Sequence, residues 1–266
     1  MSESNDELTL STNALAALQE FKQEEQQRQE EFEKLFKQAD ESFEEKKRIQ
    51  GMELFKEDWQ LSQFWYTDDT ADVLAEALLE GADSDTVIAV VSAPSVYAAI
   101  LRRPKEQIPT KNIYLFEYDT RFELLAGRNH YVYYDYVQPL EFPDQLKGKV
   151  DRLLIDPPFL HDNCQTNCMC SLKSRVSRTL MNSILTCLTA SITAKALLAP
   201  KDGSKTTNGY LRHRFMSCTG ERMAELISKV YPDSKITTFL PQHANGLSNE
   251  FRCYADFEWK KWKFCT

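Results

Sequence analysis

Short apolar runs, each followed by polar or turn-forming residues, recur along the middle and the end of the chain. They fall at residues 86–91, 112–116, 131–136, 151–155, 210–218, 235–240 and 251–257. Runs of this length that are rich in Val, Ile, Leu, Tyr and Phe are typical of strands. The uninterrupted apolar stretch at residues 153–155 is typical of a buried parallel strand, and the last two runs predict a hairpin-like pair.

Between these strands, apolar residues recur with the period of a helix. Residues 67–79 place Val73, Leu74, Ala77 and Leu78 on one face, with Thr70 or an Asp before it as the cap. Further helices are predicted at residues 96–101, 188–198 and 220–230. Strands that alternate with helices predict an α/β fold, with a mostly parallel sheet between helices on both faces.

The first 50 residues follow a different pattern. Residues 1–10 are polar, and we expect them to be disordered. Residues 11–50 consist of helix formers without Gly or Pro, but nothing apolar lies between Phe21 and Phe32. This pattern favours a solvated helical extension, with a partner-docking helix as the alternative, ahead of one larger domain at residues 51–266.

Composition narrows the function classes. The chain has 266 residues, of which 42% are hydrophobic, and a net charge of −8, which disfavours non-specific nucleic-acid binding and suits a basic protein partner. Its eight glycines include no G-x-G-x-x-G loop. Seven cysteines, no secretory signal and no membrane-length apolar run predict a cytoplasmic protein with free thiols. We expect a monomer that binds no membrane.

The run at residues 151–155 ends in Asp156-Pro157-Pro158-Phe159. Proline cannot donate to a sheet ladder, so the strand must stop there, at the sheet edge where α/β proteins bind ligands. Asp156 and the Pro157 carbonyl can accept hydrogen bonds from an amine, and Phe159 offers a flat face to a planar or cationic group. The structural alternative is a turn stiffened by proline.

Similar signals follow the three earlier strands. Residues 86–91 run into Ser92-Ala93-Pro94, whose small side chains and helix start let a ligand approach the backbone although no glycine is present. Glu117 and Asp119 follow the second strand, where a carboxylate can accept both hydroxyls of a ribose; a solvated acid is the alternative. Asp135 ends the third strand and can hold an exocyclic amine.

Residues 59–66 contain four aromatic side chains, two glutamines and a serine. Two interpretations explain such a cluster equally well. The aromatic side chains pack in the core, or the segment lies over a nucleoside. The segment that would cover the ligand includes Gln63, Phe64, Trp65 and Tyr66.

Taken together, these landmarks resemble the eukaryotic lysine methyltransferases that act on translation elongation factor 1-alpha, a branch of the N6-adenine methyltransferase fold. The Ser-Ala-Pro-Ser turn in place of a glycine loop is part of that resemblance. The matching stretches span nearly the whole chain in order: residues 14–21, 59–66, 91–97, 116–119 with Arg121 and Phe122, 134–136, 156–160 with Cys164, 217–220 and 249–254.

The resemblance implies a seven-stranded class I (Rossmann-like) methyltransferase fold, S-adenosylmethionine as the methyl donor and a lysine of elongation factor 1-alpha as the acceptor. It implies no metal. Residues implied at the cofactor are Gln63, Phe64, Trp65, Tyr66, Ser92, Ala93, Pro94, Glu117, Asp119, Asp135 and Tyr136. Those implied at the reacting amine are Asp156, Pro157, Pro158 and Phe159, and those at the protein substrate are Phe159, Leu160, Asn249, Glu250 and Phe251.

Two rival functions share these features. Asp-Pro-Pro-aromatic also serves adenine methylation of DNA or RNA, which the acidic charge and the lack of a basic, aromatic-rich stripe disfavour. The other rival is a catalytically impaired binding protein.

Residues 167–190 depart from the family spacing and contain Cys168, Cys170 and Cys187 with several bases. A metal site lacks a second cysteine pair at ligand spacing, and a basic substrate-gripping loop suits a basic substrate poorly. We favour a translated intron. The codons of residues 167–170 can contain a splice donor, those of residues 184–186 a branch-point sequence and those of residues 189–190 a splice acceptor. Removal of the intron would join Asn167 through one serine to Ser191, which restores the family spacing.

Overall fold

The structure is a computed structural model that describes residues 23, 27–28, 51–58, 61, 63–157, 185, 187–246 and 251–265. The chain divides into two compact units, residues 1–47 and residues 48–266. In the first unit only Gln23, Gln27 and Arg28 are described, and all three are helical.

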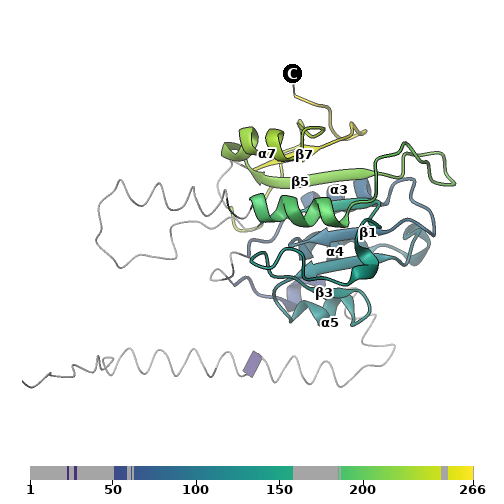
Figure 1. Ribbon diagram of the computed structural model, residues 1–266. Helices are drawn as coiled ribbons and strands as arrows, with labels where there is room; N and C mark the ends of the chain where they lie inside the picture. Colours follow the sequence, from purple (N-terminus) through teal and green to yellow (C-terminus); the bar gives the residue numbers. More distant parts are fainter. Residues whose placement is uncertain are drawn as a thin grey trace, which may run out of the picture. The chain divides into compact units, whose positions relative to one another are not determined.

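A seven-stranded sheet forms the centre of the second unit, in the order β3-β2-β1-β4-β5-β7-β6 (Figure 1). β1 to β5 pair in parallel, whereas β7 runs antiparallel to both β5 and β6. The strands are β1 (Ile88–Val91), β2 (Ile113–Glu117), β3 (Tyr131–Tyr133), β4 (Arg152–Ile155), β5 (Arg214–Gly220), β6 (Lys235–Ile236) and β7 (Phe251–Ala255). The predicted seven-stranded, mostly parallel α/β fold is therefore confirmed.

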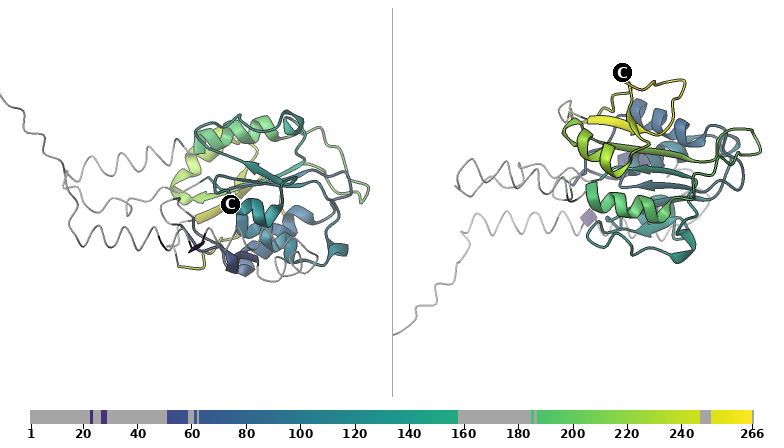
Figure 2. Two further views of the ribbon diagram at one scale, coloured as in Figure 1. Left: turned by 90° about the horizontal axis from the view of Figure 1, so that it is seen from below. Right: turned by 45° about the horizontal axis from the view of Figure 1, so that its top comes forward.

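Helices cover both faces of this sheet (Figure 2). One face carries α3 (Asp68–Leu79), α4 (Pro94–Arg102) and α5 (Phe122–Ala126). The other carries α7 (Ala224–Val230) and a helix over residues 187–197. Short 3-10 turns complete the unit: η1 (Gly51–Leu54), η3 (Lys105–Gln107), η4 (Asp144–Leu146) and η6 (Glu221–Met223).

A hydrophobic core lies between the sheet and the two helices on its other face, α7 and the helix over residues 187–197. Alternate strand residues such as Val91 and Ile155 point to that side and pack with Ala194, Leu197 and Ile227 of the covering helices. Every residue of β1 and β4 is buried, as expected for central strands between two helical layers. The central strands thus hold their carboxyl ends in fixed positions.

Several predicted boundaries are wrong, for local reasons. Thr67, and not Thr70 or an Asp, caps α3, because its hydroxyl accepts the Thr70 N–H at 3.3 Å. β5 begins at residue 214 because residues 205–211 close a separate turn, in which the Thr206 N–H donates to the Tyr210 carbonyl at 2.8 Å. β3 and β6 are shorter than predicted, and α5 was not predicted. β6 and β7 do pair antiparallel, as the expected C-terminal pair.

Candidate active site

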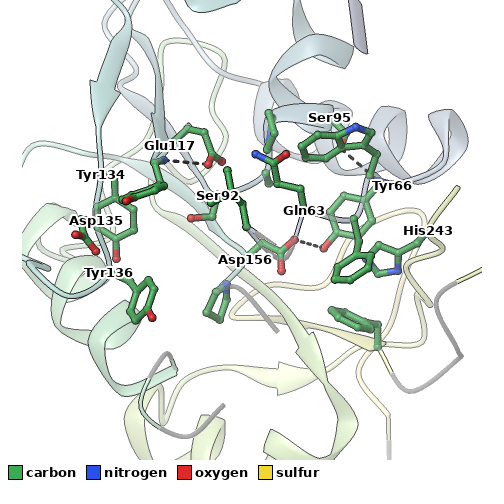
Figure 3. A pocket seen from close by; sticks show the side chains of 18 of the residues that line it. Gln63, Tyr66, Ser92, Ser95, Glu117, Tyr134, Asp135, Tyr136, Asp156 and His243 are labelled. Carbon is green, nitrogen blue, oxygen red and sulfur yellow. Dashed lines mark hydrogen bonds between the residues drawn. The ribbon is translucent and has the colours of Figure 1, made fainter. Parts of the chain in front are cut away.

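A cavity of about 330 Å³ opens where β1, β2 and β4 end (Figure 3). Parallel strands bring their carboxyl ends to one edge of a sheet, so three separate turns meet at this point. The described residues that line it are Leu61, Gln63, Phe64, Trp65, Tyr66, Ser92, Ala93, Pro94, Ser95, Glu117, Tyr118, Tyr134, Asp135, Tyr136, Val137, Asp156, Pro157, His243 and Phe251.

The turn from β1 to α4 forms one wall. Ser92 has a φ of 56°, the left-handed conformation that glycine adopts most readily. Ala93 caps α4 without a side-chain hydrogen bond, and Pro94 occupies its first turn. The small side chains leave the positive end of the helix dipole facing the cavity. This is the role that a glycine-rich loop plays elsewhere.

Glu117 lies at the end of β2 and is 7% exposed. Its Oε1 accepts the backbone N–H groups of Tyr118 at 2.9 Å and Asp119 at 3.3 Å. Burial, together with the nearby charge of Asp119, raises the pKa of the carboxyl to about 7. Among the described residues no donor contacts its second oxygen, which therefore has unused acceptor capacity beside the cavity.

Asp119, predicted to contact a cofactor, is not among the residues that line the cavity. Its carboxylate accepts hydrogen bonds from Gln63 Nε2 at 2.8 Å and from Arg121 at 2.6 to 3.0 Å. The same Gln63 accepts from Arg121 Nη2 at 3.2 Å. Asp119 therefore anchors residues 63–66 to the end of β2, and its effect on a ligand would be indirect.

Asp135 and Tyr136 lie just beyond β3 and line the cavity beside Glu117. Asp135 Oδ1 accepts the Val137 N–H at 2.8 Å in a local turn, so β3 ends before it. Tyr134 is buried and shares a 2.9 Å hydrogen bond with Thr193 of the helix over residues 187–197. These contacts hold an acid and an aromatic ring at the edge of the sheet.

Asp156 occupies the middle of the cavity, directly after β4 (Figure 3). Its Oδ2 accepts a 2.7 Å hydrogen bond from the Tyr66 hydroxyl. Burial raises the pKa of the Asp156 carboxyl to about 8, the Tyr66 hydrogen bond lowers it and the nearby Glu117 raises it. Tyr66 is itself held by its backbone N–H, which donates to Ser95 Oγ at 3.2 Å.

Trp65 and Phe64 complete the segment over the cavity. The Trp65 ring N–H donates to the Phe55 carbonyl at 3.1 Å, and its ring packs edge-on against Phe122. The segment therefore packs against the core and faces the cavity at the same time. The core-packing interpretation of residues 59–66 therefore applies to Trp65, and the interpretation as a segment over a nucleoside stays a prediction.

His243 also lines the cavity, and sequence reasoning missed it. Its ring lies 4.8 Å from that of Tyr66 and 4.5 Å from that of Phe251, between centroids. Burial lowers the pKa of this imidazole to about 4, so it is uncharged at neutral pH. No strand end or motif marks residue 243, and long-range contacts of its loop, among them its antiparallel bridge to Tyr66, bring it here. Leu61 lies within the predicted covering segment at residues 59–66. The other lining residues that were not predicted are Ser95, Tyr118, Tyr134 and Val137.

Five predicted site residues lie outside the described residues: Pro158, Phe159, Leu160, Asn249 and Glu250. The same holds for Trp59 and for most of residues 167–190. Within the described part of the chain, no group of His, Cys, Asp and Glu has the arrangement of a metal site. No described helix combines the length and apolar character needed to cross a membrane.

Comparison with known proteins gives consistent matches. Residues 57–259 match the family described as "Probable N6-adenine methyltransferase". Protein-lysine N-methyltransferase EFM5 of Saccharomyces cerevisiae is 63% identical over 258 residues, which cover 97% of this chain and 95% of that protein. EEF1A lysine methyltransferase 1 of Homo sapiens is 32% identical over 261 residues, and that of Mus musculus is 31% identical, each covering 97% of both chains.

These matches extend over the whole sheet and the cavity. The Asp-Pro-Pro motif after β4 and the acids after β2 and β3 lie within the matched residues. The chain therefore belongs to the family of protein-lysine N-methyltransferases that contains EFM5 and EEF1A lysine methyltransferase 1, within the N6-adenine methyltransferase fold family.

Proposed function

We propose that this protein uses S-adenosylmethionine to methylate a lysine of translation elongation factor 1-alpha. The observation that carries the proposal is the position of Asp156, in one cavity with Glu117 and Asp135. The names of two relatives support the acceptor: the human and mouse proteins are called EEF1A lysine methyltransferases. We also propose that the protein acts as a monomer in the cytoplasm and that nucleic acid is not its acceptor.

The residues at the strand ends fit the parts of this cofactor. We assign Glu117, with one carboxylate oxygen unused by described donors, to the two ribose hydroxyls. Asp135 and Tyr136 suit the amine and the flat face of adenine. The turn of Ser92 to Pro94, beside the α4 N-terminus, suits the carboxylate of the methionine part. Gln63 to Tyr66 would close over that part.

The acceptor amine must lose a proton before it can attack. Bound S-adenosylmethionine supplies an electrophilic methyl group on a sulfonium. A free lysine has a pKa of about 10.4, so presenting it uncharged at pH 7 costs on the order of 4–5 kcal/mol. Burial of the ammonium near a second positive charge lowers that cost.

Asp156 is suited to hold this amine in its uncharged form. Burial raises the pKa of Asp156 to about 8, so its carboxyl is mostly protonated at pH 7 and stabilises a lysine ammonium less than a carboxylate would. The Tyr66 hydroxyl keeps one carboxylate oxygen fixed, which leaves the other for the amine. We therefore assign Asp156 the role of aiming the nitrogen lone pair, while water takes the proton.

The test is a transfer assay with labelled S-adenosylmethionine and three separate mixtures: elongation factor 1-alpha, a mixture of DNA and RNA, and no acceptor. We expect label on the elongation factor only, and none with Asp156→Ala. Label on nucleic acid would favour adenine methylation. Cofactor binding with no transfer to either acceptor would favour a binding protein.

A further inference from the structure

The cavity has two chemically different ends (Figure 3). Glu117, Asp135 and Tyr136 lie at one end, and Tyr66 and His243 lie at the other, with Asp156 between them. Under the proposed function the acidic end holds the nucleoside. The aromatic end then remains for the group that receives the methyl.

His243 is fixed firmly at this aromatic end. Its backbone forms an antiparallel bridge with that of Tyr66. On either side, the Thr67 N–H donates to the Gln242 carbonyl at 2.9 Å, and the Ala244 N–H donates to the Trp65 carbonyl at 2.8 Å. The loop after β6 is thus attached to the segment that carries Tyr66, and the imidazole is held as part of the wall.

The ring of His243 packs between two others. The Tyr66 ring is tilted by 30° to it, and the Phe251 ring meets it edge-on at 69°. The imidazole is 8% exposed, and burial keeps it uncharged at neutral pH. The charge of Glu57 raises the pKa of the ring, but by less than burial lowers it. The rings of Tyr66, His243 and Phe251 therefore form one flat, uncharged surface. Tyr66 connects this surface to Asp156, because its hydroxyl donates a hydrogen bond to that side chain.

We propose that His243 is a specificity-determining residue whose ring, with Tyr66 and Phe251, forms the wall along which the acceptor lysine reaches Asp156. The inference rests on the proposed function. An aromatic wall suits the four methylene groups of lysine and attracts its cationic end. A charged residue at the same place would repel that cation.

The test compares His243→Ala, His243→Phe and His243→Lys with the wild-type chain. Steady-state transfer to elongation factor 1-alpha gives kcat and KM for the acceptor, and calorimetry gives the Kd of S-adenosylhomocysteine. Leu240→Lys is the control for added charge, because Leu240 is half-exposed on the same loop and does not line the cavity.

We expect His243→Ala to raise the acceptor KM by about tenfold, with the Kd of S-adenosylhomocysteine changed by less than about threefold. His243→Phe restores a ring and should recover most of that KM. His243→Lys should lower kcat/KM by about 100-fold, well beyond any effect of Leu240→Lys.

Other results would overturn the inference. If His243→Ala leaves the acceptor KM unchanged, or if His243→Phe is as impaired as His243→Ala, the ring is not the wall. A weaker Kd for S-adenosylhomocysteine without a change in acceptor KM would assign His243 to the cofactor. No transfer by the wild-type chain, despite cofactor binding, would refute the proposed function itself and this inference with it.

Discussion

At the scale of single residues, the hydrogen bond between Tyr66 and Asp156 connects the covering segment to the proposed reaction centre. We predict that Tyr66→Phe lowers kcat by about fivefold, because one side-chain hydrogen bond is worth on the order of 1 kcal/mol. The Kd of S-adenosylhomocysteine should change little, since the ring remains. Tyr210→Phe, which removes the hydroxyl of a half-exposed tyrosine outside the cavity, is the matched control. Equal effects of the two variants would contradict the assigned role of the bond.

Glu117 predicts a pH dependence of cofactor binding. Its pKa is raised to about 7, so the protonated form predominates below that pH and the carboxylate above it. Only the carboxylate accepts from both ribose hydroxyls, so the affinity for S-adenosylhomocysteine should rise by roughly tenfold from pH 6 to pH 8. Calorimetry across this range, with Glu117→Gln as a weaker and pH-independent binder, checks it. A flat wild-type profile would show that Glu117 does not titrate on binding.

Single residues also show how far sequence reasoning reaches. Glu117, Asp135 and Asp156 were found because each follows an apolar run, and the ends of parallel strands meet at one sheet edge. His243 was missed because it lies on a loop whose place depends on a long-range bridge to residue 66. Asp119 was expected at the ligand, but its neighbour Arg121 neutralises it and turns it into an anchor for Gln63.

At the scale of elements, buried arginines of two strands hold the end of α3. Arg152 of β4 is fully buried and donates to the carbonyls of Leu78 at 2.6 Å and Glu80 at 2.8 Å. Arg214 of β5 donates to the Ala77 carbonyl at 2.6 Å. The last carbonyls of a helix need such partners when they are buried.

We therefore predict that Arg152→Met lowers the free energy of unfolding by about 3 kcal/mol, because it leaves buried carbonyl groups without a hydrogen-bond donor. Urea titration measures this. The comparison is Lys229→Met, which breaks an exposed ion pair with Glu225 and should cost less than about 0.5 kcal/mol. If Arg152→Met were as mild as Lys229→Met, these bonds would not stabilise the helix end.

The strands of the sheet were predictable to different degrees. β1, β2, β4 and β7 were located by apolar runs or regular alternation, because those patterns follow directly from burial on one or both faces. The predicted start of β5 at residue 210 was wrong because the chain turns around Gly209, with a φ of 79°, and the Tyr210 carbonyl accepts the Thr206 N–H. α5 has only five residues, too few for a helical period to be visible.

The helix over residues 187–197 bears on the translated-intron hypothesis. Cys187 and Ala190 belong to residues 167–190 yet are buried in the core, and Cys187 Sγ lies 3.8 Å from Thr219 Oγ1. If the hypothesis holds, a chain that joins Asn167 through one serine to Ser191 should transfer methyl about tenfold faster or more, because small displacements beside reacting groups are costly. The assay and a melting curve check it. A joined chain with lower Tm and lower activity would show that the segment belongs to the protein.

At the scale of the whole molecule, charge and architecture agree with a protein acceptor. The net charge of −8 opposes binding to the phosphates of nucleic acid and favours a basic partner. The sheet order brings the ends of β1, β2 and β4 into one cavity, and the family comparison covers residues 57–259. Fold alone does not choose between adenine and lysine, so the acceptor must be identified by chemistry.

The most direct measurement is peptide mass spectrometry of elongation factor 1-alpha after incubation with this protein and S-adenosylmethionine. The account predicts added methyl groups on a lysine side chain with the wild-type protein, and none with Asp156→Ala when that variant still binds S-adenosylhomocysteine. An unmodified elongation factor, or methyl groups that persist with Asp156→Ala, would contradict it.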